Sequence, residues 1–135
     1  MEVGGRMKLI LILKEICYRL NLIADYVVEQ GTTGVWIYQK WNSGWAECWT
    51  YSDISLAGAQ TPTALLGGYW TYTDVVLPFE MTYSSITASA NGKTGTGLGF
   101  GYAGAISSTT VRVYVLGNQN DKNMVYNAIV HGRWK

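Results

Sequence analysis

The fold is decided by residues 35–50, which read VWIYQKWNSGWAECWT. The side-chain period changes to two at residue 35, and residues 35–40 and 45–50 are rich in the aromatic and β-branched residues typical of strands. The intervening residues 42–44, Asn-Ser-Gly, supply turn chemistry. We therefore predict a β-hairpin, with one strand on each side of this turn.

Further short strands are predicted after the hairpin, at 69–72, 75–77, 83–90, 97–102, 109–116 and 124–134. In the last two, alternate residues share one face, namely Val111, Val113 and Val115 in one strand and Met124, Tyr126, Ala128 and Val130 in the other. About seven or eight short strands at this spacing indicate an antiparallel, jelly-roll-like β-sandwich over residues 35–135. The strand order stays open.

Glycines occupy every second position of one predicted strand, at Gly95, Gly97, Gly99 and Gly101. Such a strand has one face without side chains, so another backbone, an aromatic ring or a subunit can approach it closely.

A different pattern precedes the β region. Apolar residues are spaced alternately by four and three residues, at Leu9, Leu13, Ile16, Leu20, Ile23 and Val27. This is a coiled-coil seam, and Leu at a with Ile at d favours three or four helices over two. We predict a flexible N-terminus at 1–7, a helix at 8–30 that forms a parallel homotrimer, and a hinge at 31–34. The alternative is one amphipathic helix packed onto its own β domain.

Composition narrows the classes of partner. Charged residues make up 14% of the 135 residues and the net charge is +1, so neither nucleic acid nor an anionic membrane is an expected partner. The aliphatic run at 9–13 is far shorter than the ~20 residues that span a bilayer. Cys17 and Cys48 lack metal-site spacing and are expected to be free thiols.

No motif in the chain carries a complete chemistry. Residues 92–94, Gly-Lys-Thr, lack the rest of a phosphate-binding loop, and the glycines at 99, 101 and 104 lead into a strand instead of a helix. His131 is the single histidine and fits a hydrogen-bonded sheet residue better than a ligand or base. We therefore predict no enzymatic activity, no metal and no cofactor.

The aromatic residues carry more information, since the chain has 6 Trp and 10 Tyr. Most should be buried in the core or between subunits, but exposed rings can serve as platforms for sugar rings, with Asn and Asp binding the hydroxyls. The candidate glycan-binding residues lie in an irregular stretch and in a polar loop, namely Trp70, Tyr72, Asp74, Asn118, Asn120 and Asp121.

Three segments of the chain resemble one protein family. They are residues 38–44 with 46–49, Leu77-Pro78-Phe79, and residues 129–134, which end in Gly-Arg-Trp. They resemble the C-terminal, receptor-binding head domain of tail-fibre proteins from phages and prophages of gut Firmicutes, with Leu77 where Phe is usual. The likeness covers about residues 33–135 and brings no catalytic residues.

The resemblance implies a trimeric β-sandwich at the tip of a fibre in the virion tail, made in the host cytoplasm. We expect a receptor-binding head that attaches to a bacterial surface polysaccharide. Family members usually end a long protein, so the chain is expected to be either a piece of a fibre or a small fibre whose N-terminus docks on another virion tail protein. The alternatives are a structural trimerisation or decoration module of the virion, and a tailspike-like polysaccharide depolymerase.

Overall fold

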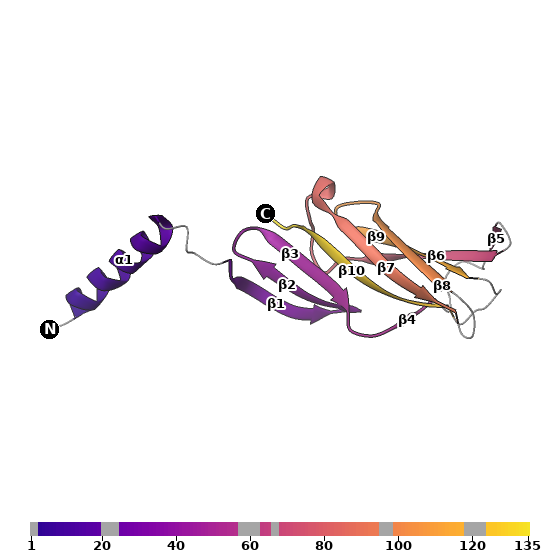
Figure 1. The fold of residues 1–135 in the computed structure, drawn as a ribbon, viewed down its shortest axis with the longest axis horizontal. Helices are drawn as coiled ribbons and strands as arrows, with labels where there is room; N and C mark the ends of the chain where they lie inside the picture. The colour runs from indigo at the N-terminus through magenta and orange to yellow at the C-terminus, as the bar shows by residue number, and fades with distance from the viewer. Residues whose placement is uncertain (1–2, 20–24, 57–62, 66–67, 95–98, 118–123) are drawn as a thin grey trace.

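The computed structural model describes residues 3–19, 25–56, 63–65, 68–94, 99–117 and 124–135 (Figure 1). Its elements are α1 (Val3–Arg19), β1 (Val27–Thr33), β2 (Trp36–Trp41), β3 (Trp45–Thr50), β4 (Ile54–Ser55), β5 (Thr63–Leu65), β6 (Gly68–Val76), the 3-10 turn η1 (Tyr83–Ser85), β7 (Thr87–Lys93), β8 (Gly99–Ala105), β9 (Thr110–Gly117) and β10 (Val125–Arg133). Ten of these elements are strands, so the described chain is mainly β, as predicted. The strand pairs are antiparallel.

The first sheet contains six strands. β1, β2, β3 and β10 lie side by side in that order, and β10 also pairs with β4 and β7. The predicted hairpin is confirmed, because β2 and β3 pair with Trp36 opposite Thr50 and Lys40 opposite Ala46. Gly44 in the turn between them has a φ of 94°, which glycine adopts without steric cost.

The second sheet contains four strands in the order β5-β6-β9-β8. Buried side chains of both sheets join in one hydrophobic core. The predicted alternation is confirmed in β9 and β10, where Val111, Val113, Val115, Tyr126, Ala128 and Val130 are buried. Two antiparallel sheets around one core agree with the predicted sandwich, while its jelly-roll-like path stays a prediction.

The backbones of β7 and β8 approach each other closely, and Figure 1 shows the two strands side by side. A Cβ atom on Gly101 would lie 2.5 Å from the backbone nitrogen of Gly92 and 2.6 Å from the carbonyl oxygen of Ala90. One on Gly99 would lie 2.7 Å from the carbonyl oxygen of Gly92. The expected contact of a glycine face with another backbone is thus confirmed for these two residues; Gly95 and Gly97 lie outside the described residues.

The predicted helix at 8–30 is wrong at both ends. α1 begins at Val3, inside the segment predicted to be flexible, and ends at Arg19. Val27, assigned to the helical seam, begins β1 and lies opposite Trp41 of β2. The residues Val27, Val28, Thr32 and Thr33 are β-branched and favour a strand, and pairing with β2 satisfies the backbone groups of this segment. Leu20 and Ile23 of the seam lie outside the described residues.

The β domain therefore begins at Val27 instead of residue 35, and the predicted hinge at 31–34 is part of its first hairpin. Gly31, the first residue of the predicted hinge, lies within β1 opposite Tyr38, where a Cβ atom would meet the Tyr38 hydroxyl at 2.9 Å. Gly34, with a φ of 59°, makes the turn between β1 and β2. The segment at 83–85, predicted as the start of a strand, is the 3-10 turn η1.

α1 stands apart from both sheets in Figure 1. Its described apolar side chains are all 45–62% exposed, namely Leu9, Ile10, Leu11, Ile12, Leu13 and Ile16. The described part of this helix is therefore not packed on its own β domain, which was the alternative to a trimer. The structure contains one copy of the helix, so a coiled coil stays a prediction.

Glu29 connects the edge strand β1 to β2. The Tyr38 hydroxyl donates a hydrogen bond to its Oε1 at 3.0 Å, and Lys40 Nζ lies 3.0 Å from its Oε2. Lys40 Nζ also lies 4.3 Å from the centroid of the Phe79 ring, a cation–π distance. The hydrogen bonds from Lys40 and Tyr38 lower the pKa of Glu29 below its usual value.

We expect Glu29 to stabilise the β domain only while it is ionised. A carboxylate whose pKa is lowered by folding contributes stability above its unfolded-state pKa, and this contribution is lost as the pH falls through the folded-state value. Below about pH 4, the unfolding temperature of the wild type should therefore fall more steeply than that of Glu29→Gln. Thermal unfolding followed by circular dichroism between pH 7 and 2 measures this, and parallel curves would contradict it.

Candidate functional site

Aromatic and apolar side chains cover the outer face of the four-stranded sheet. They alternate along each strand with inward-pointing residues such as Thr71, Ala103 and Val113, which are buried. We call these outward residues the aromatic face; they are Trp70 and Tyr72 on β6, Tyr114 and Leu116 on β9, and Phe100 and Tyr102 on β8. Phe100 and Tyr102 are 70% and 64% exposed, so this face is open to a partner.

The strand register arranges the outer face in rows that cross β6, β9 and β8. Each row takes one residue from each strand, and the three rows are Trp70–Leu116–Phe100, Tyr72–Tyr114–Tyr102 and Asp74–Arg112–Gly104. Cross-strand neighbours on one face lie close enough to interact. Two rows made of aromatic residues and one leucine therefore lie beside one row that carries a charged pair.

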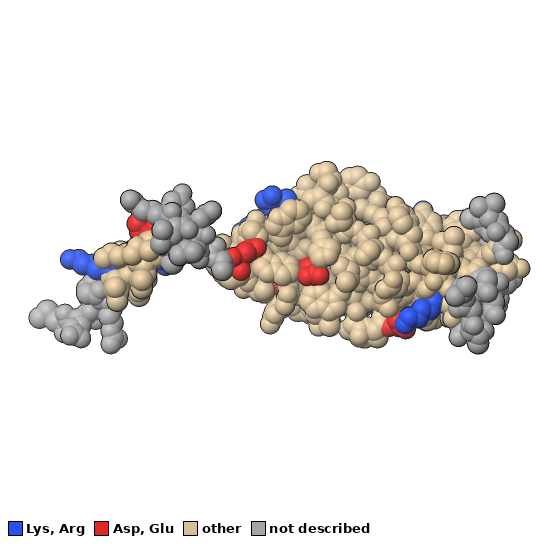
Figure 2. All heavy atoms as spheres, viewed as in Figure 1, with Lys and Arg blue, Asp and Glu red and all other residues tan. Residues whose placement is uncertain are grey.

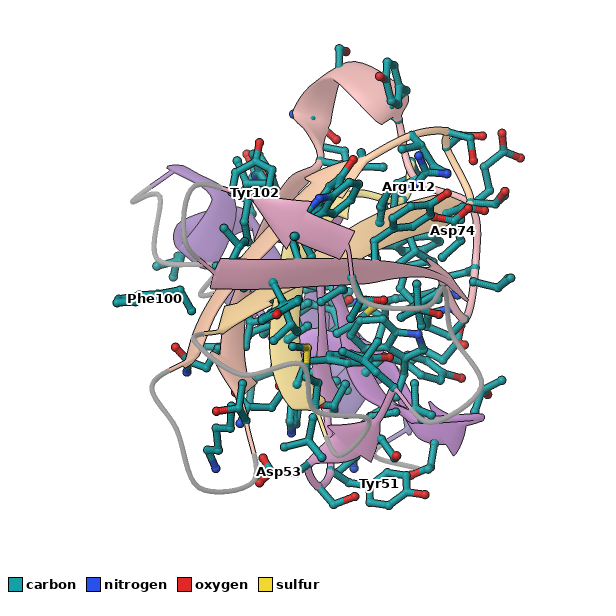
Figure 3. All side chains as sticks on the ribbon, turned by 90° about the vertical axis from the view of Figure 1, so that its right-hand side faces the viewer. Tyr51, Asp53, Asp74, Phe100, Tyr102 and Arg112 are labelled. Atoms are coloured by element: carbon teal, nitrogen blue, oxygen red, sulfur yellow. The ribbon has the colours of Figure 1, made fainter. Side chains whose placement is uncertain are left out.

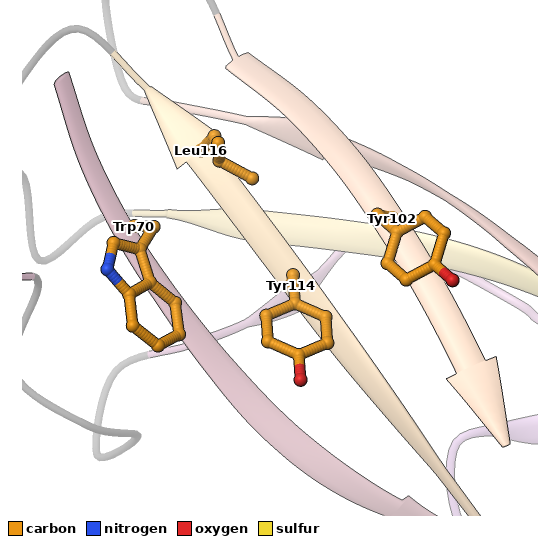
Figure 4. A pocket seen from close by; sticks show the side chains of 4 residues that line it. All are labelled: Trp70, Tyr102, Tyr114 and Leu116. Atoms are coloured by element: carbon orange, nitrogen blue, oxygen red, sulfur yellow. The ribbon is translucent and has the colours of Figure 1, made fainter. Parts of the chain in front are cut away.

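The rings of the aromatic face lie next to one another. The centroid of Tyr114 is 6.0 Å from that of Trp70 and 6.0 Å from that of Tyr102, and Trp70 and Tyr72 stack at 5.8 Å. Figure 4 shows Trp70, Tyr114 and Tyr102 across the three strands, with their ring faces toward the viewer. These three rings and Leu116 line an open, apolar hollow of about 430 Å³.

Asp74 and Arg112 form the charged pair beside these rings. Arg112 donates to the carboxylate through Nε at 2.6 Å and through Nη2 at 2.9 Å, and Figure 3 shows the two side chains together. The guanidinium carbon lies 4.3 Å from the centroid of the Tyr72 ring. The hydrogen bonds from Arg112 hold the pKa of Asp74 below its usual value, and those to Asp74 and Tyr114 raise the pKa of Arg112.

The aromatic face lies away from α1. Trp70 pairs with Thr63 of β5, and β5 is at the end of the β domain opposite the helix in Figure 1. The aromatic face therefore begins at the end of the β domain that is farther from the helix.

The structure brings together half of the predicted ligand-binding residues. Trp70, Tyr72 and Asp74 all lie on β6, spaced by two, and so share the outer face. Asn118, Asn120 and Asp121 lie outside the described residues. A role in binding stays a prediction for all six residues.

The sequence analysis missed Phe100, Tyr102, Tyr114, Leu116 and Arg112 as members of the site. A signal was present, because Tyr114 and Arg112 alternate with the core valines of β9, and Phe100 and Tyr102 alternate with glycines. The register that places them beside Trp70 depends on the pairing of β6 with β9, two strands far apart in the sequence, which a local sequence pattern does not reveal.

The other residues considered for chemistry have structural partners. Lys93 lies in β7 and pairs with Asp53 at 2.8 Å, and His131 Nε2 lies 3.7 Å from Glu47 Oε1 on the six-stranded sheet. Cys48 is a free, buried thiol, as predicted, and burial raises its pKa to about 12. The side chain of Cys17 lies outside the described ones. Within the described residues, His, Cys, Asp and Glu side chains form no group of three that could hold a metal ion.

Comparisons with protein families, with curated proteins and with solved structures found no match to this chain. Among the described residues, no helix has the length and apolar character needed to cross a membrane.

Proposed function

We propose that this protein is a receptor-binding head of a phage tail fibre that adheres to a bacterial surface glycan without catalysis. The aromatic face is the observation that carries the proposal. Aromatic rings with a few polar groups at their edge are the usual composition of a small-molecule site, and the C–H faces of sugar rings stack on such rings. The resemblance of residues 33–135 to tail-fibre head domains supports the same function.

The proposed assembly is a homotrimer held by α1. The helix carries Leu9, Leu13 and Ile16 at seam spacing, and each of these side chains is about half exposed in the single chain. Association of α1 helices would bury them, which is favourable by about 25 cal/mol for each Å² of apolar surface. Three linked heads would bind a repetitive polysaccharide with an avidity ~10²–10⁴-fold above that of one site.

A test of this function compares two exposed tyrosines. Tyr102→Ala removes a ring of the aromatic face and should weaken binding to cell-wall polysaccharide by about tenfold or more, because one stacking partner is lost. Tyr51→Ala is the control, since Tyr51 is 59% exposed and lies away from Tyr102 in Figure 3. Binding of the purified protein to immobilised polysaccharide measures both. Equal binding by the two variants would count against the aromatic face as the site.

One observation favours the alternative of a structural module of the virion. The exposed apolar surface of α1 implies contact with another protein chain, but it does not imply a ligand. It predicts that the aromatic face is covered in the assembled protein. The depolymerase hypothesis needs two facing carboxylates. Among the described residues of the four-stranded sheet, Asp74 has the one carboxylate, and it is paired with Arg112.

A further inference from the structure

We infer that the aromatic face selects an uncharged stretch of polysaccharide, and that the Asp74–Arg112 pair is the polar rim that selects against acidic sugars. This inference rests on the proposed function and names the chemical class of its ligand. It follows from the shape of the ring cluster, the position of the charged pair, and the charge balance of the whole sheet.

The floor of the site, formed by the rings of Trp70, Tyr114 and Tyr102, is elongated across the strands. Tyr114 lies between Trp70 and Tyr102, with 6.0 Å between neighbouring centroids, and the ring planes of these two pairs differ by 35° and 41°. Rings placed side by side with moderate tilts make a floor longer than one ring. A chain of linked sugar rings fits such a floor better than a single small ligand does.

The rim lies one row away from the floor. Asp74 and Arg112 face each other one row beyond Tyr72 and Tyr114, so a sugar stacked on Tyr114 would direct hydroxyls toward them. Arginine has five N–H donors, and Asp74 takes two of them here, while the carboxylate keeps lone pairs for further donors. The pair can therefore exchange hydrogen bonds with hydroxyl groups without being broken.

The charge balance of the sheet argues against an acidic ligand. Asp74 and Arg112 are the only charged residues in the sequences of β5, β6, β8 and β9, and they neutralise each other. Figure 2, in the view of Figure 1, shows few described Lys, Arg, Asp and Glu side chains on that side of the molecule, in keeping with the 14% of charged residues in the chain. A uronate or phosphate group would find Arg112 already held in a two-bond pair and would be repelled by the adjacent carboxylate.

The experiment compares each polysaccharide in a neutral form and in an acidic form. A panel of neutral hexose polysaccharides is compared with the same polymers oxidised to uronic acids at C6, with the full-length protein at two salt concentrations. We expect the wild type to bind a neutral polymer at least tenfold more tightly than its oxidised form, with little dependence on salt. Asp74→Asn leaves Arg112 without its ionic partner, so this difference should shrink and binding of the oxidised form should become sensitive to salt.

Asp53→Asn is the matched control. Asp53 is also in a salt bridge and its side chain is also 41% exposed, but its partner Lys93 lies on the six-stranded sheet. Asp53→Asn changes the net charge by the same amount as Asp74→Asn. It should keep the wild-type ratio of the affinity for the neutral polymer to the affinity for its oxidised form. If this affinity ratio is unchanged in Asp74→Asn, or changes equally in both variants, the Asp74–Arg112 pair does not select against acidic sugars.

The remaining outcomes separate this inference from the proposed function. Tighter binding of an oxidised polymer by the wild type, lost in Tyr102→Ala, would refute the selection while leaving the aromatic face as a glycan site. Binding of neither form across the panel would count against both. A smaller assembly in Tyr102→Ala would show that a second copy of the chain covers this face, and would refute both as well.

Discussion

Leu13→Asp should reduce the mass of the assembled protein from that of three chains to that of one. Leu13 is 51% exposed on α1 and occupies an a position of the predicted seam. In a trimer, three carboxylates would meet in one apolar layer, and burying unpaired charges costs far more than the layer contributes. Light scattering coupled to size-exclusion chromatography measures the mass directly.

Leu11→Asp is the matched control for this prediction. Leu11 is 62% exposed on the same helix but lies off the seam, on the side that would face solvent in the trimer. It should leave the mass at three chains. A wild-type mass of one chain would contradict the trimer at once, and an equal loss of mass in both variants would contradict the assigned seam.

Gly101→Ala should destabilise the β domain by about 3 kcal/mol, an unusually large effect for one added methyl group. The new Cβ atom would lie 2.5 Å from the backbone nitrogen of Gly92 and 2.6 Å from the carbonyl oxygen of Ala90. Because the atoms it meets belong to the backbone of β7, no side-chain rotation can relieve the overlap. Strands β7 and β8 would have to separate, although each is held in its own sheet.

Gly104→Ala provides the comparison on the same strand. The nearest atom to its Cβ would be the Tyr102 hydroxyl oxygen at 3.6 Å, an ordinary contact distance. Its free energy of unfolding should stay within about 0.5 kcal/mol of the wild type. Urea denaturation of the three proteins measures the difference. Equal stability of the two variants would show that the contact between β7 and β8 is not as close as described.

The elements predicted correctly are those whose signal is local. The hairpin of β2 and β3 follows from a period of two on both sides of Asn42-Ser43-Gly44, and the buried faces of β9 and β10 follow from their alternating valines and other apolar residues. β1 was missed because Val27 also continued the four-three spacing of the helix. What makes it a strand is its pairing with β2, which needs the turn at Gly34 and residues up to Trp41.

The residues of the candidate site also fall into two groups, those indicated by a local sequence pattern and those that only strand pairing brings together. Trp70, Tyr72 and Asp74 could be named from a few adjacent residues, but the stretch that was predicted to be irregular is the strand β6, which places all three on one face. Tyr114 joins them through the pairing of β9 with β6, two strands that lie far apart in the sequence. Tyr102 is then added by the pairing of β8 with β9, which follow each other along the chain. The salt bridge from Asp74 to Arg112 depends on the same register, so the sequence alone could not assign the rim of the site.

The most direct test of the aromatic face as a glycan site is a titration of the ¹⁵N-labelled protein with cell-wall polysaccharide fragments, observed at its tryptophan indole N–H signals. The chain has 6 Trp, and single substitutions assign the signals. Trp70 lies on the aromatic face, whereas the indoles of Trp36 and Trp134 donate to carbonyl groups within the protein. We expect the Trp70 signal to shift with added glycan while the other five stay in place. A shift at Trp45 or Trp49, on the six-stranded sheet, with Trp70 unchanged would contradict this account.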